Sequence, residues 1–351
     1  METILDHPEQ LEALDRGGML KALRRFPESC RDGVKVAEEL PLDTLSKRRF
    51  KAIAIVGIGG SAIGGQLLHD WLLDSTAIPL LVCRGSSLPA FIDEETLIFA
   101  VSYSGNTEET LTALGEALER KCPVVALTSG GRMQELSAEK GLPVLPLPKG
   151  MQPRAALPNQ FFSLTNTVMR LGLASGLRNE IDEVVEVLEA LRDAIVPEVP
   201  TSRNLAKKTA LGLKGMVPFV YGPHPLGAVA YRIRTQLNEN GKVPAASGSF
   251  PEAFHNAVMG CEGPEEVRRS VCTLIIRDTA ESPEIGRKTE GFKRLLESGG
   301  GRVLEIRARG NGKLARMFSA LYVGDYASAY LGLLYGLDPS SMDSITALKR
   351  F

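Results

Sequence analysis

Two short loops rich in glycine and hydroxyl side chains are the segments of this sequence best suited to chemistry. Residues 57–65 read GIGGSAIGG, residues 102–107 read SYSGNT, and each loop follows a short apolar run. Glycine lets the backbone turn sharply and approach a ligand closely, and the unpaired amides at the start of a helix favour an anion. The hydroxyls of Ser102, Ser104 and Thr107 can add donors to the same anion. Together the loops favour a small phosphorylated ligand.

The same two loops also allow alternative interpretations. The first loop alone fits a tight structural turn, and Ser or Thr at a helix start is commonly an ordinary cap. Gly57, Gly59 and Ala62 also match the spacing of a dinucleotide fingerprint. That fingerprint requires an acidic residue about 20 positions later, after the second strand. The corresponding stretch, residues 80–84, reads LLVCR and has no acid, which counts against a nicotinamide-dependent dehydrogenase.

A carboxylate, a histidine and two cations are candidates for catalysis. Glu239 lies in NENGK, just past an expected helix, and is either a solvated surface residue or a base held by its two flanking amides. His255 lies 16 residues later in FPEAFHN. A lone histidine is usually structural or a solvated surface residue, but both residues fall in expected loops, where catalytic groups often lie. Arg154 follows the last strand of the first expected sheet, at the edge where α/β sheets bind ligands. Lys349 by default belongs to a solvated tail.

Alternating strands and helices must position these residues. Short apolar runs predict strands buried on both faces, as in a parallel sheet. The predicted strands are residues 52–56, 80–82, 97–101, 123–127 and 144–147 in the first half, and 217–221, 273–277 and 303–306 in the second. The predicted helices are residues 62–73, 108–120, 133–140, 159–173, 180–194, 226–237, 284–298 and 313–335. The fold class is therefore α/β, with a doubly wound parallel sheet in each half.

The length of 351 residues fits two domains. We expect an N-terminal helical segment over residues 1–50, a first domain over 51–195 and a second domain with a C-terminal tail over 196–351. A Pro-rich stretch at 196–200 (VPEVP) has the composition of an interdomain linker.

Bulk composition excludes several classes of protein. The 41 Lys and Arg nearly balance the 42 Asp and Glu, so no global field attracts nucleic acid or an anionic membrane. No apolar run approaches the about 20 residues that span a bilayer, and the acidic N-terminus does not resemble a signal peptide. The 5 scattered cysteines and 4 isolated histidines suggest neither a disulfide framework nor a zinc site. We expect a cytoplasmic protein with no metal and no cofactor.

Taken in order, the motifs resemble those of a known family. GIGGSAIGG and SYSGNTEET look like the phosphate loops of sugar-isomerase (SIS) domains. With PR at 153–154, NENGKVPA at 238–245 and PEAFHN at 251–256, nearly the whole chain is similar to the bifunctional phosphoglucose/phosphomannose isomerases of archaea and bacteria. The resemblance implies two SIS domains, each a flavodoxin-like parallel sheet flanked by helices.

The resemblance also implies a reaction and a set of roles. The reaction is an aldose–ketose isomerisation between glucose 6-phosphate and fructose 6-phosphate, a step of glycolysis and gluconeogenesis, through a cis-enediol(ate) and without metal. Glu239 would be the base that moves a proton between C1 and C2, and Arg154 would stabilise the enediolate oxygen. His255, from the partner subunit of a homodimer, would help open the sugar ring, assisted by Lys349. The phosphate-binding residues would be Gly59, Gly60, Ser61, Ser102, Ser104 and Thr107.

The sequence departs from the family in two places. The family usually has an Asn directly before the His, where this chain has Phe254. Archaeal members have a Thr near the C-terminus that helps admit mannose 6-phosphate, whereas the tail here offers Ser340 and Ser341, so acceptance of the mannose epimer stays open. Two rival hypotheses also remain, an isomerase of another phosphosugar and a non-catalytic SIS-type sensor of sugar phosphates.

Overall fold

The computed structural model describes residues 3–174 and 178–348. It divides into two compact units, Phe26–Asn179 and Met1–Arg25 together with Glu180–Phe351. Each unit contains one sheet, and we call them the sheet A unit and the sheet B unit. The division crosses the N-terminal helical segment: η1 (Ile4–Asp6), α1 (Pro8–Leu14) and α2 (Met19–Arg24) belong to the sheet B unit, and α3 (Phe26–Glu38) belongs to the sheet A unit.

Sheet A has five parallel strands in the order β2-β1-β3-β4-β5, the arrangement of a flavodoxin-like fold. Its strands are β1 (Ala52–Val56), β2 (Leu80–Cys83), β3 (Thr96–Val101), β4 (Val124–Thr128) and β5 (Val144–Pro146). Every residue of β1, β3 and β4 is buried, because helices cover both faces. This confirms the interpretation of the apolar runs as strands of a parallel sheet.

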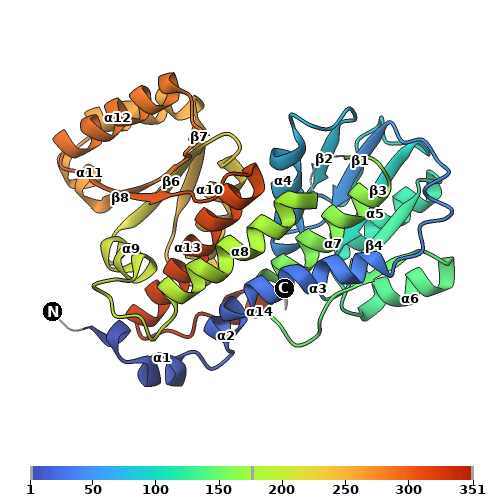
Figure 1. Ribbon diagram of the computed structural model, residues 1–351, viewed down its shortest axis with the longest axis horizontal. Coiled ribbons are helices and arrows are strands. Elements are labelled where there is room, and N and C mark those ends of the chain that lie inside the picture. The colour runs from blue at the N-terminus through green and yellow to red at the C-terminus, as the bar shows by residue number, and fades with distance from the viewer. Residues whose placement is uncertain (1–2, 175–177, 349–351) are drawn as a thin grey trace. The chain divides into compact units, whose positions relative to one another are not determined.

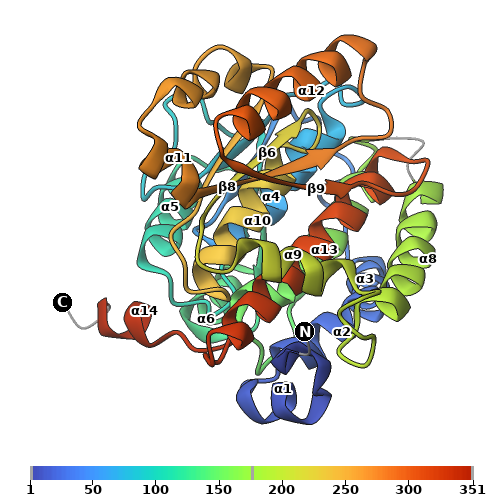
Figure 2. The same cartoon turned by 90° about the vertical axis from the view of Figure 1, so that its left-hand side faces the viewer.

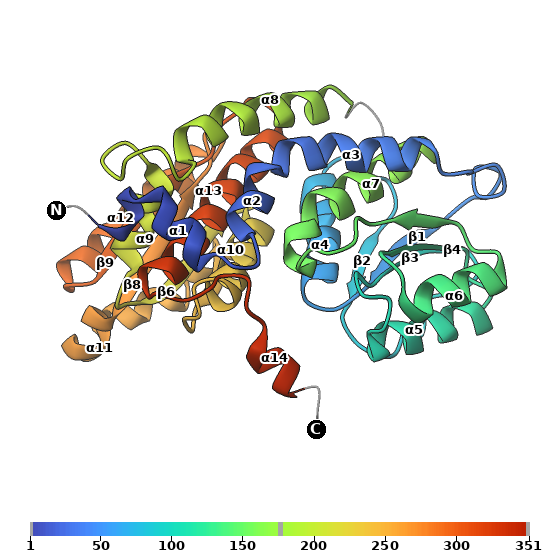
Figure 3. The ribbon, with the colours of Figure 1, turned by 90° about the horizontal axis from the view of Figure 1, so that it is seen from below.

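The helices of the sheet A unit lie in two layers. The helices α3, α4 (Gly60–Leu72) and α7 (Leu157–Arg170) lie on one face, and α5 (Glu108–Glu119) and α6 (Gly131–Lys140) lie on the other (Figure 3). A short helix, η2 (Pro153–Ala156), precedes α7. Gly65 lets α4 lie close to the sheet, since a Cβ there would be 2.8 Å from a methyl carbon of Ile55.

Sheet B has four parallel strands in the order β7-β6-β8-β9. Its strands are β6 (Val217–Pro223), β7 (Ala246–Phe250), β8 (Val271–Arg277) and β9 (Arg302–Arg307). The sequence did not predict β7, because ASGSF has no apolar run. Its small residues suit the position: a Cβ at Gly248 would be 2.7 Å from the ring of Tyr221 on β6.

The helices of the sheet B unit also cover both faces. The helices α9 (Leu205–Leu213), α10 (Gly227–Glu239) and α13 (Lys313–Leu334) lie on one face, and α11 (Glu265–Ser270) and α12 (Pro283–Ser298) lie on the other (Figures 1 and 2). The remaining helical segments are α8 (Arg178–Ile195), η3 (Glu252–Phe254), η4 (Ala257–Glu262) and α14 (Asp343–Leu348). No helix among the described residues combines the length and apolar character needed to cross a bilayer.

The helix α13 is buried almost along its whole length and is the core of its unit. The Tyr322 hydroxyl donates to the Leu23 carbonyl at 2.8 Å, and the Tyr330 hydroxyl donates to the Ile195 carbonyl at 2.7 Å. Both phenol groups are buried, and each finds a backbone partner, as buried hydroxyls require. The end of α2 and the end of α8 are thereby fixed to α13.

The Pro-rich stretch at 196–200 lies inside the sheet B unit, and the two units divide between Asn179 and Glu180. The buried ammonium of Lys207 donates to the carbonyls of Pro197, at 2.7 Å, and Val199, at 2.8 Å, and also to that of Leu5. Burial lowers the pKa of Lys207. One lysine therefore ties the Pro-rich turn and the N-terminal segment to α9.

The carboxylate of Asp6 gives this region a pH-dependent stability. Asp6 Oδ1 accepts a 2.8 Å hydrogen bond from the Thr201 amide, which is the main reason that the pKa of Asp6 falls from 3.8 to about 2. A lowered carboxyl pKa stabilises the fold above the unfolded value and loses that contribution as pH falls through the folded value. We expect Asp6→Asn to lower the free energy of unfolding by about 1 kcal/mol at pH 7, after allowance for solvent screening.

Urea unfolding at pH 7 and at pH 3 measures this contribution. The difference between Asp6→Asn and the unsubstituted protein should be smaller at the lower pH. The control Asp43→Asn changes an exposed aspartate and should have no such effect. An equal difference at both pH values would assign the loss to something other than the charge of Asp6.

Candidate functional site

The carboxyl ends of the sheet A strands bring three segments together. The Tyr103 amide donates to Ser61 Oγ at 3.3 Å, which joins the loop after β3 to the loop after β1. Gly60 lies directly against η2, since a Cβ there would be 3.3 Å from the Arg154 nitrogen. The predicted phosphate loops and Arg154 therefore meet at one edge of the sheet, as the strand order requires.

The loop after β1 presents backbone donors. Gly59 is the N-cap of α4, and no side chain of the described residues caps this helix. The backbone of Gly59 has φ +56° and ψ −122°, a conformation that suits glycine, and the space around it is open. Among the described residues, the amides of Gly59 and Gly60 have no hydrogen-bond acceptor. The start of α4 is therefore available to an anion.

The loop after β3 presents hydroxyls beside a second helix start. Thr107 is the N-cap of α5, but its side chain does not cap the helix; its hydroxyl instead lies 2.9 Å from that of Ser102. The interpretation of Thr107 as an ordinary cap is therefore wrong. Ser102 is fully buried, whereas Ser104 is exposed and its Oγ accepts from the Asn106 amide at 3.3 Å. Within the described ranges, the first amides of α5 remain without side-chain partners.

The sequence did not single out Tyr103, which joins the second loop to the segment before Arg154. Its hydroxyl donates to the Pro148 carbonyl at 2.8 Å and accepts from the Met151 amide at 2.8 Å. The Arg154 side chain, three residues further on, is buried, with 1% of its surface exposed. The signal in the sequence was only an aromatic residue between two serines. Tyr103 is therefore a positioning residue for the Arg154 segment.

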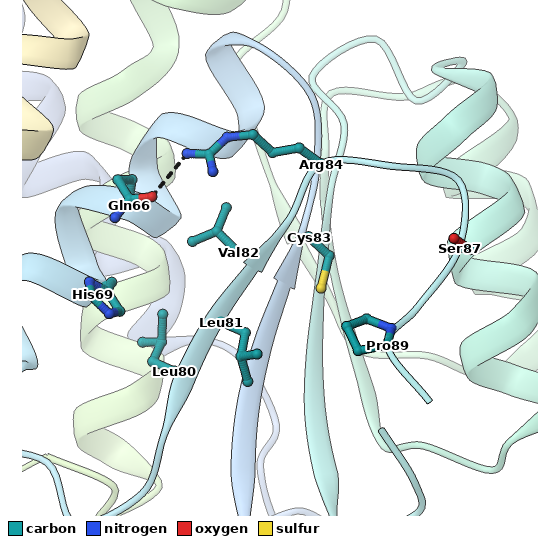
Figure 4. A pocket seen from close by; sticks show the side chains of 9 residues that line it. All are labelled: Gln66, His69, Leu80, Leu81, Val82, Cys83, Arg84, Ser87 and Pro89. Carbon is teal, nitrogen blue, oxygen red and sulfur yellow. Dashed lines mark hydrogen bonds between the residues drawn. The ribbon is translucent and has the colours of Figure 1, made fainter. Parts of the chain in front are cut away.

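The second strand of sheet A ends in a cation where a dinucleotide site needs an acid. Arg84 follows β2 and donates to Gln66 Oε1 of α4 at 3.1 Å (Figure 4). Both side chains line a recess of about 430 Å³ along β2, together with His69 and Ser87. None of the described residues that line this recess is a carboxylate, so the structure agrees with the sequence in lacking the acid that would bind a ribose.

The corresponding edge of sheet B is occupied by an ionic network. Arg277, the last residue of β8, pairs with Glu281 at 2.5 Å, with Glu305 at 3.1 Å and with Glu290. These carboxylates raise the pKa of Arg277. Because three carboxylates surround this arginine, the edge does not suit a phosphate. The candidate anion site is therefore the edge of sheet A.

Glu239 is the last residue of α10 and is half-buried. The sequence predicted that the helix ends at residue 237 and that Glu239 lies in the following loop. The helix instead continues through Glu239, and Lys242 has the left-handed φ of +56°. The Lys242 ammonium donates to the carbonyls of Glu239, at 2.5 Å, and Ser341, at 2.6 Å. The flanking amides support the turn, since Asn238 donates to the Val243 carbonyl and Asn240 to Ser328 Oγ.

His255 is exposed and follows η3, beyond the far end of β7. The helix α10 runs back against the strands, so Glu239 lies before β7 and His255 lies after it. The five residues of β7 rise by about 16 Å. One chain therefore holds Glu239 and His255 towards opposite edges of sheet B. Lys349 lies outside the described residues.

Comparisons with known proteins show the family to which this chain belongs. A family model described as an SIS domain matches residues 46–139, and a model of the bacterial phospho-glucose isomerase C-terminal SIS domain matches residues 202–351. A bifunctional phosphoglucose/phosphomannose isomerase of Caldicellulosiruptor bescii is 37% identical over 333 residues, 95% of this chain and 98% of that protein. The chain belongs to the family of bifunctional phosphoglucose/phosphomannose isomerases.

Two further similarities extend over most of this member of the family. An Aquifex aeolicus protein of the same name is 33% identical, over 86% of this chain and 90% of its own. The crystal structure of a hypothetical protein from Thermus thermophilus matches with a TM-score of 0.79 at 18% identity, over 99% of this chain and 93% of that one. This structural likeness confirms the fold. The two family-model matches coincide with sheet A and sheet B, which confirms two SIS domains.

One departure from the bifunctional isomerases has a structural reason. Phe254, in place of the usual Asn, stacks on Phe250 with ring centroids 4.4 Å apart and packs edge-on against Phe292 at 6.1 Å. The residue before His255 therefore contributes to an apolar cluster. A polar side chain at this position would lose that packing.

Proposed function

We propose that this protein is a sugar-phosphate isomerase that interconverts glucose 6-phosphate and mannose 6-phosphate with fructose 6-phosphate. The observation that carries the proposal is the carboxyl edge of sheet A, where uncapped amides of α4 and α5, hydroxyls and Arg154 surround one place. The names of the Caldicellulosiruptor bescii and Aquifex aeolicus relatives agree with it. The reaction belongs to glycolysis and gluconeogenesis, and we assign it to the cytoplasm, where the five free cysteines would remain reduced.

In the proposed mechanism the phosphate binds to Gly59, Gly60, Ser61, Ser102, Ser104 and Thr107. The Glu239 carboxylate removes a proton from the carbon next to the carbonyl and returns it to the neighbouring carbon. The Arg154 guanidinium stabilises the negative charge on the enediolate oxygen. The His255 imidazole exchanges a proton during ring opening, a role that suits histidine because an imidazole can gain or lose a proton near neutral pH. Lys349 assists in this step.

The positions of Glu239 and His255 support a homodimer in which His255 serves the partner's site. A single chain places the two residues on opposite sides of β7, so one C1–C2 unit within one chain would not contact both. In a two-fold dimer each site can take Glu239 from one chain and His255 from the other.

Mixing two inactive variants tests this arrangement. Glu239→Gln and His255→Ala dimers, dissociated together and reassembled, should recover up to about a quarter of the original activity, because half of the dimers are mixed and each has one intact site. Each variant reassembled alone is the control. No recovery in verified mixed dimers would place both residues of a site on the same chain.

Turnover of fructose 6-phosphate, with and without EDTA, tests the function itself. Coupled assays should detect glucose 6-phosphate and mannose 6-phosphate separately, and we expect both products at rates that the chelator does not change. A loss of turnover with EDTA would contradict the mechanism without metal. If a folded dimer that binds the substrate formed neither product, a sugar-phosphate sensor or an isomerase of another phosphosugar would replace this proposal.

The Ser104 hydroxyl is the exposed hydroxyl of the second loop, so its removal should weaken phosphate binding. We expect Ser104→Ala to raise KM for fructose 6-phosphate about 10-fold or more, because hydrogen bonds to charged groups contribute about 1.5–3 kcal/mol. Steady-state kinetics measure the effect. The control Ser87→Ala removes an exposed hydroxyl after β2, at the same edge of the sheet. Equal KM values for the two variants would remove Ser104 from the phosphate site.

A further inference from the structure

The sheet B unit contains a cavity that the proposed reaction does not use. It has a volume of about 320 Å³ and lies between sheet B and the segments η4, α11 and α12. Phe219 and Tyr221 of β6 line it from the sheet, and Phe292 and Leu296 of α12 line it from the side. This volume and this apolar, aromatic lining are typical of sites for small organic ligands.

Two of the three segments around the cavity, η4 and α11, bury their side chains only in part. Neither η4 nor α11 has a buried residue. Val267 of α11 lines the cavity and is nevertheless 55% exposed. Protein interiors are normally close-packed, so an apolar space of this size beneath a loosely packed cover is suited to be filled by a bound molecule.

One cation lines this apolar space. Arg268 of α11 is half-buried, and its side chain makes no hydrogen bond or ion pair with any residue of the described ranges. Its neighbour Arg269 is exposed and pairs with Glu265 at 2.5 Å. A guanidinium beside an apolar cavity favours a ligand that has an anionic group on an apolar body.

We propose that this cavity binds a small amphiphilic anion, an aromatic ring or short aliphatic chain with one carboxylate or sulfonate directed at Arg268. A hexose phosphate does not fit this description, because most of its hydroxyl groups would be unpaired against Phe219, Phe292 and Leu296. The site is thus chemically distinct from the edge of sheet A. Asn256 and Ala257 line the cavity directly after His255, so the ligand contacts the segment that carries this histidine.

Two fluorescent probes test the charge requirement. Anilinonaphthalene sulfonate has an apolar body and one sulfonate, and N-phenylnaphthylamine has a similar body without charge. We expect the sulfonate to bind with one site per chain and Arg268→Met to weaken it about 10-fold, with little change for the neutral probe. The control Arg269→Met removes the adjacent cation and should change neither affinity. If the sulfonate bound Arg268→Met and Arg269→Met with equal affinity, Arg268 would not be the residue that binds the anionic group.

Cys261 reports whether the probe occupies this cavity. It lines the cavity and is partly exposed, whereas the other four cysteines are buried. The bound sulfonate should therefore slow alkylation of Cys261, and saturating fructose 6-phosphate should not. Ala257→Phe should exclude both probes by filling the space, whereas Met259→Ala changes an exposed residue of the same segment that does not line the cavity.

The outcomes separate this proposal from the proposed function. Ala257→Phe and Met259→Ala should both retain cooperative urea unfolding. This excludes binding of the probe to a partly unfolded chain. If the sulfonate binds Ala257→Phe as it binds the unsubstituted protein, or if fructose 6-phosphate displaces it, the cavity is not its site. Isomerase turnover, measured on the same samples, is an independent test of the sheet A site.

Discussion

Replacing Glu239 with glutamine is expected to reduce isomerase turnover by about 10²–10⁴-fold, the range that a positioned general base contributes. Glutamine preserves the size of the side chain and removes the ability to accept the C1 or C2 proton. The backbone contacts of this position should persist, because Lys242 donates to the main-chain carbonyl of residue 239 and the adjacent Asn240 side chain donates to Ser328 Oγ. The loss should therefore be in kcat, with sugar-phosphate binding nearly unchanged.

Two measurements separate these effects. The kcat for fructose 6-phosphate measures the chemical step, and calorimetry with glucitol 6-phosphate, which has no carbonyl to isomerise, measures binding. Glu252→Gln is a matched control, since Glu252 is an exposed carboxylate that accepts from Asn256 Nδ2 at 2.8 Å. Normal turnover by Glu239→Gln would show that another group is the base.

Replacing Asp325 with asparagine should lower the free energy of unfolding of the sheet B unit by about 3–5 kcal/mol. Arg232 of α10 and Asp325 of α13 form a buried, two-pronged ion pair, with Nη2–Oδ2 at 2.8 Å and Nε–Oδ1 at 3.1 Å. Their side chains are 2% and 0% exposed. Removing one charge leaves the other buried without its counter-charge, which costs more than the pair contributes when both are present.

Urea unfolding of the full chain measures the loss, and a double variant tests its cause. Arg232→Met combined with Asp325→Leu removes both charges and should recover most of the stability, since apolar residues of similar size often replace a buried ion pair at little cost. Glu281→Gln is a control in a more accessible ion pair. A loss below about 1 kcal/mol in Asp325→Asn would mean that water reaches the Arg232 guanidinium.

Replacing Asp325 should also affect the position of Glu239. Both α10, which ends in Glu239, and α13 carry one member of the ion pair, and Ser328 of α13 receives the hydrogen bond of Asn240. A carboxylate that acts as a base must be held within a fraction of an ångström, and two packed helices can supply that rigid support. The stability of the ion pair and the position of Glu239, the proposed base, therefore depend on the same contact between α10 and α13.

The sequence was most informative where burial imposes one pattern. Strands covered on both faces must be continuously apolar, so β1, β3 and β4 were evident from their residues alone. It failed at β7, where ASGSF carries no apolar run because small residues are needed against Tyr221. It also did not predict α9, and it placed a linker at 196–200, where Lys207 instead ties the turn into a core.

The candidate site shows the same difference. Glycine and hydroxyl spacing predicted both loops after β1 and β3, since the turn into a helix has local backbone requirements. Local sequence did not reveal that the Thr107 hydroxyl pairs with Ser102, or that Tyr103 holds the segment before Arg154. These contacts join residues of different loops, whose proximity depends on the order of the strands in the sheet.

Residue types at short, fixed spacings were enough to predict the fold class, the two candidate anion-binding loops and the family. Tertiary structure alone decided that Gly60 lies against Arg154, that an ionic network fills the edge of sheet B, and that β7 separates Glu239 from His255. Each of these features depends on which elements become neighbours. The packing of each sheet against its own helices decides this, and no local sequence pattern does.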